Sequence, residues 1–426
     1  MILTFSKILK MRLKSIFDYT EPQLNKYLRD EDINLSINAK RYMVVRHLGI
    51  KDEHFTEHQY FPNAMLLSNS YFELEEYLYT EIGLFTLSLM DETLEKATLD
   101  DQGINVSNAK KISRALIGNN SLRIFNFTNI NIDTDGFAYI ADALIKNKSI
   151  TTLNLSGDYL KATGAQYVSQ IILRNRVIEH INLSQNDLKS LGTRHICELL
   201  KQNTTLKSIN LNQNEIGNVG AQYVGEMLDI NKTLKELHLQ NNLITDARYI
   251  FDSNNQTIEK LWFGFNSISN MYHVGKFLER NKSLRILSFE WTNIKEKEFV
   301  YISDSLRINS TLTHLNISHN FITVNGMKYF SDALKENISL EYLNVSGNDG
   351  IVYIYDALEY NNHLVEIMPR LMTHPKLDKN LQYKLTMLPL LKGERIGLYL
   401  SMIIIHLSKD IIDEFIDFHK RINYNA

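Results

Sequence analysis

The amino-acid sequence predicts an α/β solenoid in which a short strand, a turn and a helix recur along most of the chain. A leucine or isoleucine opens each unit at intervals that are mostly 28 residues and otherwise 24 or 26. Within a unit, apolar residues first alternate as in a strand and then recur with helical spacing. No proline interrupts the repeats, which suits continuous pairing between strands; the five prolines are Pro22, Pro62, Pro369, Pro375 and Pro389.

The unit is clearest in residues 206–231, LKSINLNQNEIGNVGAQYVGEMLDIN. With Leu206 as position 1, apolar residues stand at positions 4, 6 and 11, an asparagine at position 9 and a glycine at position 15. A single strand–helix unit cannot bury its apolar face, so neighbouring units are expected to stack around one core. Position 1 recurs in eleven units, at Leu94, Leu122, Ile150, Ile178, Leu206, Leu234, Ile258, Leu284, Leu312, Leu340 and Leu364.

The pattern LxxLxLxxN with a following helix resembles that of leucine-rich repeats. The period and the glycine at position 15 resemble the ribonuclease-inhibitor-like subfamily, over roughly residues 94–369. The resemblance implies a horseshoe with a parallel sheet on the concave face and helices on the convex face, and it says little about the partner. The Asn-, Lys- and Ile-rich, Ala-poor composition of the repeats also resembles leucine-rich effectors that intracellular bacteria deliver into host cells.

Each position of the unit has a predicted role. Positions 4 and 6 are expected to point into the core, and positions 3, 5 and 7 to line the concave face. The asparagine at position 9 is expected to bond backbone groups at the turn, as a structural residue. It stands at Asn186, Asn214, Asn242, Asn266, Asn320 and Asn348. The glycine at position 15 suits a special backbone conformation or a close approach, and it stands at Gly136, Gly164, Gly192, Gly220 and Gly326.

Three regions are predicted along the chain. Residues 1–92 lack the period and predict a helical N-terminal cap or small domain, 93–370 hold the repeats, and 371–426 predict a helical C-terminal cap and tail. Basic residues interrupt the apolar pattern of Met1–Phe17, so it is not interpreted as a cleavable signal peptide. It predicts a helix packed on the first repeat, with a basic amphipathic helix on a membrane surface as the alternative.

The C-terminal region is expected to pack rather than to span a membrane. The apolar stretch Ile396–Leu407 is too short and too interrupted to cross a bilayer, and it predicts a cap helix. The segment from Lys409 predicts an acidic amphipathic helix with a polar tail. No integral membrane segment is therefore predicted.

One short motif points to metal chemistry. His54, Glu57 and His58 match H-x-x-E-H, in which two histidines bind zinc and a carboxylate activates water. Only three fixed residues match, Pro62 follows closely, and no further acidic ligand is indicated. The motif is interpreted as a chance match, so no metal, cofactor or catalytic residue is predicted. An enzyme carried by residues 1–92, with the repeats as a targeting module, is the alternative.

Composition bounds the partners and the compartment. The net charge is −3 with no run of five like charges, so nucleic acid is not predicted as a partner. The single cysteine, Cys197, is expected to be buried in a repeat helix. Glycans on the outward sequons would crowd the sheet, so a eukaryotic secretory route is not expected. A monomer is expected in the cytoplasm, or in a host cytosol after delivery by a bacterium. The outward sequons begin at Asn126, Asn154, Asn182, Asn316 and Asn344.

The outward row at position 5 changes in the middle of the repeats. Asparagines at both ends fit a hydrogen-bonded, solvated ladder, but three units carry His238, Trp262 and Ser288 instead. This change coincides with the two shortened inner units, of 24 and 26 residues, in which the position-15 glycine is replaced by Arg248 and Tyr272. The alternative is a purely structural explanation, in which bulky side chains crowd against one another along the strands.

Both tryptophans project here, and they are predicted to lie on adjacent strands, with neither at an inward position. Aromatic side chains with charged neighbours on an exposed sheet are typical of protein-binding hot spots. The sequence therefore predicts a protein–protein interaction scaffold that binds its partner on the concave face, with a membrane-peripheral adaptor as a further alternative. The predicted binding residues are His238, Trp262, Phe265, Glu290, Trp291, His314, His319 and Tyr342.

Overall fold

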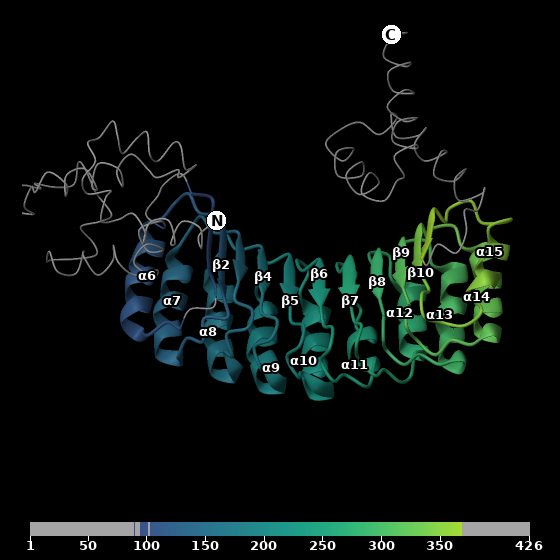
Figure 1. The fold of residues 1–426 in the computed structure, drawn as a ribbon, viewed down its shortest axis with the longest axis horizontal. Helices are drawn as coiled ribbons and strands as arrows, with labels where there is room; N and C mark the ends of the chain where they lie inside the picture. The colour runs from purple at the N-terminus through teal and green to yellow at the C-terminus, as the bar shows by residue number, and fades with distance from the viewer. Residues whose placement is uncertain (1–88, 90–93, 101–102, 369–426) are drawn as a thin grey trace, which may run out of the picture.

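The computed structural model describes residues 94–100 and 103–368, together with Leu89. These residues form a row of strand–helix units in a shallow arc, with strands on the inner edge and helices on the outer edge (Figure 1). The arrangement confirms the predicted α/β solenoid with a parallel sheet. Apart from Leu89, the predicted caps in 1–92 and 371–426 lie outside the described residues, as do Met1–Phe17, His54, Glu57, His58, Ile396–Leu407 and the segment from Lys409.

Eleven parallel strands, hydrogen-bonded in sequence order, form the sheet of the described residues. The register carries position 5 of one strand onto position 5 of the next, as at His238, Trp262 and Ser288. The strands are β1 (Lys96–Asp100), β2 (Ile124–Thr128), β3 (Thr152–Asn154), β4 (His180–Asn182), β5 (Ser208–Asn210), β6 (Glu236–His238), β7 (Lys260–Trp262), β8 (Ile286–Ser288), β9 (His314–Asn316), β10 (Tyr342–Asn344) and β11 (Glu366–Met368).

Helices cover the convex side of the sheet (Figure 1). The two shortened inner units carry the shorter helices α11 and α12, of 4 and 9 residues, and the shortened unit from Leu340 carries α15, of 4 residues. Within the described ranges, no helix is long and apolar enough to cross a membrane. The helices are α6 (Val106–Gly118), α7 (Thr134–Lys146), α8 (Lys161–Arg174), α9 (Lys189–Leu200), α10 (Gly217–Ile230), α11 (Arg248–Phe251), α12 (Tyr272–Arg280), α13 (Glu296–Ile308), α14 (Val324–Glu336) and α15 (Ile354–Ala357), with the 3-10 turn η3 (Ile351–Tyr353) before α15.

One continuous apolar core runs between the sheet and the helices, from Leu89 to Ile367. The inward positions are filled as the alternation predicts, and Leu211 at position 6 is 1% exposed. The thiol of Cys197 is fully buried in α9, as expected, and burial raises its pKa far above the ordinary range. A buried, protonated thiol packs as a small apolar group.

Phenylalanines fill the core beneath the shortened units. The Phe251 ring of α11 contacts the rings of Phe263, Phe277 and Phe289, with ring centroids 5.4 to 5.7 Å apart. Phe263 and Phe289 occupy position 6 after β7 and β8, so they lie directly under the concave surface. Large aromatic side chains here replace the volume that a longer helix fills in other units.

The asparagines at position 9 join successive turns, and their predicted structural role is confirmed. Asn214 is fully buried. Its Oδ1 accepts hydrogen bonds from the backbone N–H of Asn186 at 3.0 Å and of Leu188 at 3.3 Å, both in the preceding unit. Its Nδ2 donates to the carbonyls of Leu183 at 2.9 Å and Leu211 at 3.0 Å. One amide therefore satisfies four backbone groups that the turn would otherwise leave unpaired.

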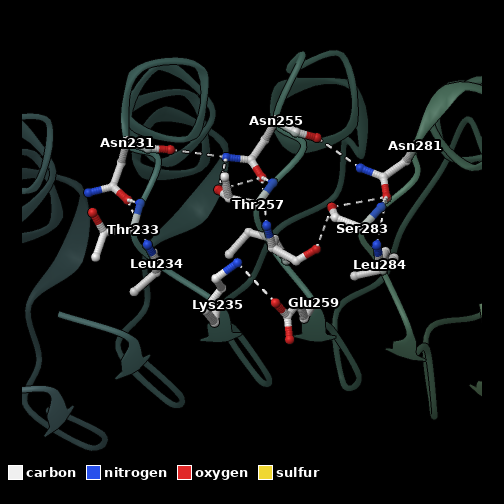
Figure 2. Close-up of polar contacts among 11 residues, drawn as sticks. Asn231, Thr233, Leu234, Lys235, Asn255, Thr257, Glu259, Asn281, Ser283 and Leu284 are labelled. Atoms are coloured by element: carbon white, nitrogen blue, oxygen red, sulfur yellow. Dashed lines mark hydrogen bonds and ion pairs between the residues drawn. The ribbon is translucent and has the colours of Figure 1, made fainter. Parts of the chain in front are cut away.

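A second row of buried asparagines, which the sequence analysis did not identify, connects each helix to the next strand (Figure 2). The Oδ1 of Asn231 accepts from the backbone N–H of Thr233 at 2.9 Å and of Leu234 at 2.8 Å. Nδ2 of Asn255 donates to the carbonyl of Asn231, and Nδ2 of Asn281 to that of Asn255. The row stands three residues before position 1, at Asn119, Asn147, Asn175, Asn203, Asn231, Asn255, Asn281, Asn309, Asn337 and Asn361.

The glycine at position 15 serves a close approach, and the alternative of a special backbone conformation does not apply, since these glycines do not adopt positive φ. A Cβ at Gly164 would lie 2.5 Å from Cβ of Leu160, and one at Gly220 would lie 2.3 Å from Cγ2 of Ile216. The missing side chain thus lets the first turn of the helix fold over the apolar residue at position 11.

Candidate functional site

The structure divides the eight predicted binding residues into two groups on one stretch of the solenoid. We use the name concave pocket for the hollow lined from outward positions 3, 5 and 7, and turn ridge for the three aromatic residues at position 8. The concave pocket contains His238, Trp262, Glu290, His314 and Tyr342. The turn ridge consists of Phe265, Trp291 and His319.

The prediction that the two tryptophans lie on adjacent strands is wrong. Trp262 is the last residue of β7, but β8 ends at Ser288, and Trp291 lies in the turn that follows. The strands are only three residues long in these units, so the alternation ends before position 8. The two indole rings therefore belong to different rows, and Trp291 is 54% exposed.

Two stacked pairs of rings form the walls of the concave pocket. The ring of His238 stacks on that of Trp262 with centroids 3.9 Å apart and an interplanar angle of 8°. The rings of His314 and Tyr342 stack at 5.6 Å and 22°. Between them lies β8, whose Ser288 is small and 3% exposed, so the floor is lower than the walls. The hollow of about 440 Å³ is also lined by Gln240, Ile286, Leu287, Ser288 and Asn316.

Glu290, at position 7, is held at one end of this hollow by three uncharged donors. Its carboxylate accepts hydrogen bonds from Gln240 Nε2 at 2.6 Å, from Ser288 Oγ at 2.6 Å and from Asn316 Nδ2. The bond to Gln240 passes over the unit between them, where Gly264 occupies position 7. A Cβ at Gly264 would lie 2.6 Å from Cγ of Glu290, so the glycine makes room for the bridge.

The charges around the concave pocket leave Glu290 without a counter-ion. Lys260 forms an ion pair with Glu236 on the neighbouring strand, whereas Glu290 forms no ion pair with any residue that the structure describes. Burial lowers the pKa of His238 and so favours its neutral form, with the Lys260 charge acting in the same direction and Glu236 opposing.

The hydroxyl of Tyr342 has a raised pKa. Burial is the largest cause, and the charges of Glu366 and Glu290 raise this pKa further. On β6, burial acts to raise the pKa of Glu236, but the bond and charge of Lys260 outweigh it and hold this pKa below its ordinary value. A carboxylate, aromatic rings and apolar contacts thus characterise the pocket.

The turn ridge places three bulky side chains in left-handed backbone. Phe265, Trp291 and His319 have φ of 57°, 53° and 54°. Side chains other than glycine and asparagine disfavour this region, at a cost on the order of 1 kcal/mol per residue. The Trp291 ring stacks on that of His319 at 4.5 Å and lies 6.2 Å from that of Phe265. Other units have small or amide side chains at position 8, namely Asn129, Gly157, Gln185, Gln213, Asn241 and Gly347.

The expected ladder of position-5 asparagines takes a different form. Asn126 donates its Nδ2 to Thr98 Oγ1 on the neighbouring strand, as a ladder requires. In five other units Oδ1 accepts from the backbone N–H two residues on, as from Ser184 to Asn182 at 3.0 Å. The side chain thereby closes the end of its strand. The same bond is made by Asn154, Asn182, Asn210, Asn316 and Asn344.

Metal-ligating side chains do not gather in the part of the chain that the structure describes. No group of three or more His, Cys, Asp or Glu residues there could hold a metal ion. Three outward histidines stack on aromatic rings: His238 on Trp262, His319 on Trp291, and His314 on Tyr342.

Stacked strand–turn–helix units with buried asparagines at both turns define the described part of the chain as a leucine-rich repeat solenoid. A family model described as "Leucine Rich repeat" matches residues 202–225, 231–247 and 309–331. Leucine-rich repeats generally act as scaffolds for protein–protein interactions, and solenoids offer an extended concave surface for this.

The chain was also compared with curated proteins and with solved structures. No curated protein matches the chain. Among solved structures, an internalin from Listeria monocytogenes strain 4b F2365 matches with 13% identity and a TM-score of 0.40, over 74% of this chain and 94% of that one. Leiomodin-1 Actin-Binding Site 2 matches with 16% identity and a TM-score of 0.24, over 44% of this chain and 88% of that one.

Proposed function

We propose that this chain is a protein-binding scaffold whose partner is a protein bound over β6–β10, across the concave pocket and the turn ridge. The observation that carries the proposal is the turn ridge, where Phe265, Trp291 and His319 occupy left-handed positions that other units give to Asn, Gln or Gly. Backbone strain of this kind clusters at functional sites. Two of the three rings are half exposed, as hot-spot aromatics are before a partner covers them.

The two groups are placed so that one partner can cover both. Glu290 of the concave pocket and Trp291 of the turn ridge are consecutive residues, and Gly264 precedes Phe265 in the same way. From β6 to β10 there are four strand spacings, or about 19 Å. A stretch of this width fits within a standard interface of about 800 Å² per partner.

Binding, rather than catalysis, is the role that these residues support. In the concave pocket, His238 is stacked and held in its neutral form, and Ser288 donates to the carboxylate of Glu290 instead of to a histidine. The arrangement supplies rings and one acceptor, and it lacks a nucleophile–base pair of the kind that acyl transfer needs.

The test is a comparison of two double variants. Once proximity labelling has identified a partner, Trp262→Ala with Trp291→Ala should raise its Kd by more than tenfold, because truncation of central aromatics costs about 2 kcal/mol or more. The matched control, Asn154→Ala with Asn182→Ala, changes the same sheet outside the site and should change Kd by less than threefold. Melting temperatures should stay within a few degrees in the Trp pair.

Two outcomes would contradict the proposal. Equal loss of binding in both double variants would place the interface elsewhere along the sheet. A large fall in melting temperature confined to the tryptophan pair would show that these rings are packed structure.

We also infer that the scaffold is a monomeric, ribonuclease-inhibitor-like repeat protein of the cytoplasm, delivered by a bacterium into a host cytosol. The 28-residue period, the position-15 glycines and the Asn-, Lys- and Ile-rich repeats support this inference. A reporter enzyme that is active only in host cytosol, fused to the chain, should give signal in infected cells. A chain ending at Ser408 should fold equally well but deliver less; loss of its cooperative melting would make the tail part of the fold.

A further inference from the structure

We propose that the concave pocket receives one long basic side chain, arginine or lysine, of the protein partner. In this arrangement the cationic head lies at Glu290, and the aliphatic stem lies over Ile286 between the two stacked aromatic pairs. The proposal rests on the proposed function and deepens it, because it names the chemistry that the partner presents. Its experiment uses small molecules, so that it can fail or succeed independently of the partner.

The first step of the argument is charge. Glu290 is a half-buried carboxylate with three uncharged donors and no ion pair in the described part of the chain. A carboxylate has about four acceptor sites, so capacity remains for one more donor. Lys260, on the neighbouring strand β7, is already paired with Glu236. A positively charged ligand group would therefore complete the site, and an acidic one would be repelled.

The second step is shape. The wall residue Trp262 stands on β7 and His314 stands on β9, which are two strand spacings apart, or about 10 Å between backbones. A slot of this width suits one side chain rather than a helix or a strand. Its floor is Ile286 and the buried Ser288, which offer apolar contact to a methylene stem.

The third step is the nature of the walls. His238 covers the Trp262 ring from the β6 side, so the other face of the indole is turned toward the slot. The stacked rings of His314 and Tyr342 form the opposite wall. The negative quadrupole of an aromatic face attracts ammonium and guanidinium groups within about 6 Å. Burial keeps His238 largely neutral, so the ring stacked on Trp262 does not oppose a cation at pH 7. Aromatic walls next to a carboxylate are complementary to a desolvated cation. They interact much more weakly with a neutral polar side chain.

The fourth step is preorganisation. The Glu290 carboxylate is fixed before any ligand arrives, because Gln240, Ser288 and Asn316 come from three different units and converge on it. The absence of a side chain at Gly264 leaves room for the hydrogen bond between Gln240 and Glu290 across the intervening unit. Fixing a surface carboxylate costs side-chain entropy, and binding of a ligand would offset this cost. The Glu290 side chain lines the hollow, where a ligand would reach it.

The experiment uses Trp262 as its own reporter. The chain has two tryptophans, so Trp291→Phe leaves Trp262 as the only indole. N-acetyl-arginine amide, N-acetyl-lysine amide and the uncharged, near-isosteric N-acetyl-citrulline amide are titrated at constant ionic strength while Trp262 fluorescence is recorded. The arginine or the lysine compound should give a saturable change, at least tenfold tighter than the citrulline compound.

Glu290→Gln in the same background keeps the size of the side chain and removes its charge. It should weaken the cationic compound at least tenfold, while Glu366→Gln, which removes a carboxylate near Tyr342 but outside the pocket lining, should leave the affinity within twofold. If Glu290→Gln proves unstable, the comparison with citrulline decides alone, because it needs no change at Glu290.

Citrulline binding as tightly as arginine and lysine, or affinity that is indifferent to Glu290→Gln, would overturn the proposal. Choline binding tenfold tighter than both amino-acid compounds would overturn it as well, since the site would then serve a free quaternary cation. If the cationic compound binds but the tryptophan pair leaves partner affinity unchanged, the proposed function fails and the pocket assignment stands. If the tryptophan pair abolishes partner binding while the citrulline compound binds as tightly as the arginine compound, the proposed function stands and the pocket assignment fails.

Discussion

Asp158 belongs to the buried row of position-9 residues at the turns, here called the turn ladder, in which six other units carry an asparagine. A carboxyl group at this place predicts a pH-dependent loss of stability. Asp158 is 1% exposed. Its Oδ1 accepts a hydrogen bond from the backbone N–H of Ile130 at 2.6 Å, as the amide oxygens of the ladder do. Its Oδ2 is buried and has no partner. In the ladder asparagines this place holds an NH₂ group that donates to carbonyl oxygens, as Asn186 does to Leu155.

The magnitude follows from the shifted ionisation. Burial raises the pKa of Asp158 from 3.8 to about 7, with the Ile130 N–H lowering it and the charge of Asp100 raising it. A shift of one pKa unit corresponds to about 1.4 kcal/mol, so the ionised side chain costs the folded state about 4 kcal/mol. Relaxation of the surroundings would reduce this upper value.

The sign is set by which state keeps the proton. Below the unfolded pKa of 3.8 both states are protonated, and Asp158 imposes no penalty. As pH rises toward about 7, the unfolded chain releases the proton while the folded chain retains it, so the free energy of unfolding falls. Above that pH both states are ionised and the penalty is constant.

Asp158→Asn should therefore stabilise the protein, and the gain should grow by about 2 to 3 kcal/mol between pH 5 and pH 8. Urea unfolding of both proteins at several pH values measures the difference directly and cancels the titration of shared groups. Asn214→Asp is the matched control, because it places a carboxylate in the same ladder and should produce the opposite dependence. A gain that is constant with pH, or a loss of stability at pH 8, would refute the reasoning.

Three further outcomes follow from the fold. Asn231→Ala should lower the free energy of unfolding by about 2 to 4 kcal/mol, since it leaves several buried backbone groups unpaired, whereas Asn210→Ala on the outward face should cost about 1 kcal/mol or less in the same urea assay. Leu211→Asp should abolish folding, because a charge would enter the shared core; cooperative melting of a soluble variant, followed by circular dichroism, would show the register to be wrong. Purified full-length chain should contain no stoichiometric zinc by elemental analysis, and His58→Ala should melt within a few degrees of the parent; one zinc per chain, lost in that variant, would revive the enzyme alternative.

The repeat period carries most of the information about the fold. Alternation at positions 4 and 6 fixes which face of each strand is buried, as Ile209 and Leu211 illustrate, and stacking then follows because no unit can fold alone. The asparagine row at the helix ends was not predicted, although it is regular in the sequence. One asparagine stands three residues before each position 1 from Leu122 onward. Attention to apolar residues alone passes over a polar row that is equally buried.

The location of the candidate site could be proposed from the sequence, but its geometry only in part. The break in the position-5 row marks the stretch that holds the concave pocket. The place of Trp291 was missed because left-handed backbone leaves no trace in an apolar pattern, although the Asn, Gln and Gly residues at position 8 of other units give a hint. The bridge from Glu290 to Gln240 over Gly264 depends on side-chain directions, which spacing alone does not determine.

The interrupted stretch gives up stabilising contacts that its neighbours keep, and this argues that folding does not account for it. Elsewhere the position-5 asparagine closes its strand by accepting a backbone N–H, but the indole of Trp262 has no acceptor with which to do so. The sheet register nevertheless continues unbroken through β6, β7 and β8, and phenylalanines around Phe251 keep the core filled beneath them. Since core and register impose no need for aromatic residues on the outer surface, recognition of a partner is the reason that we propose for placing them there.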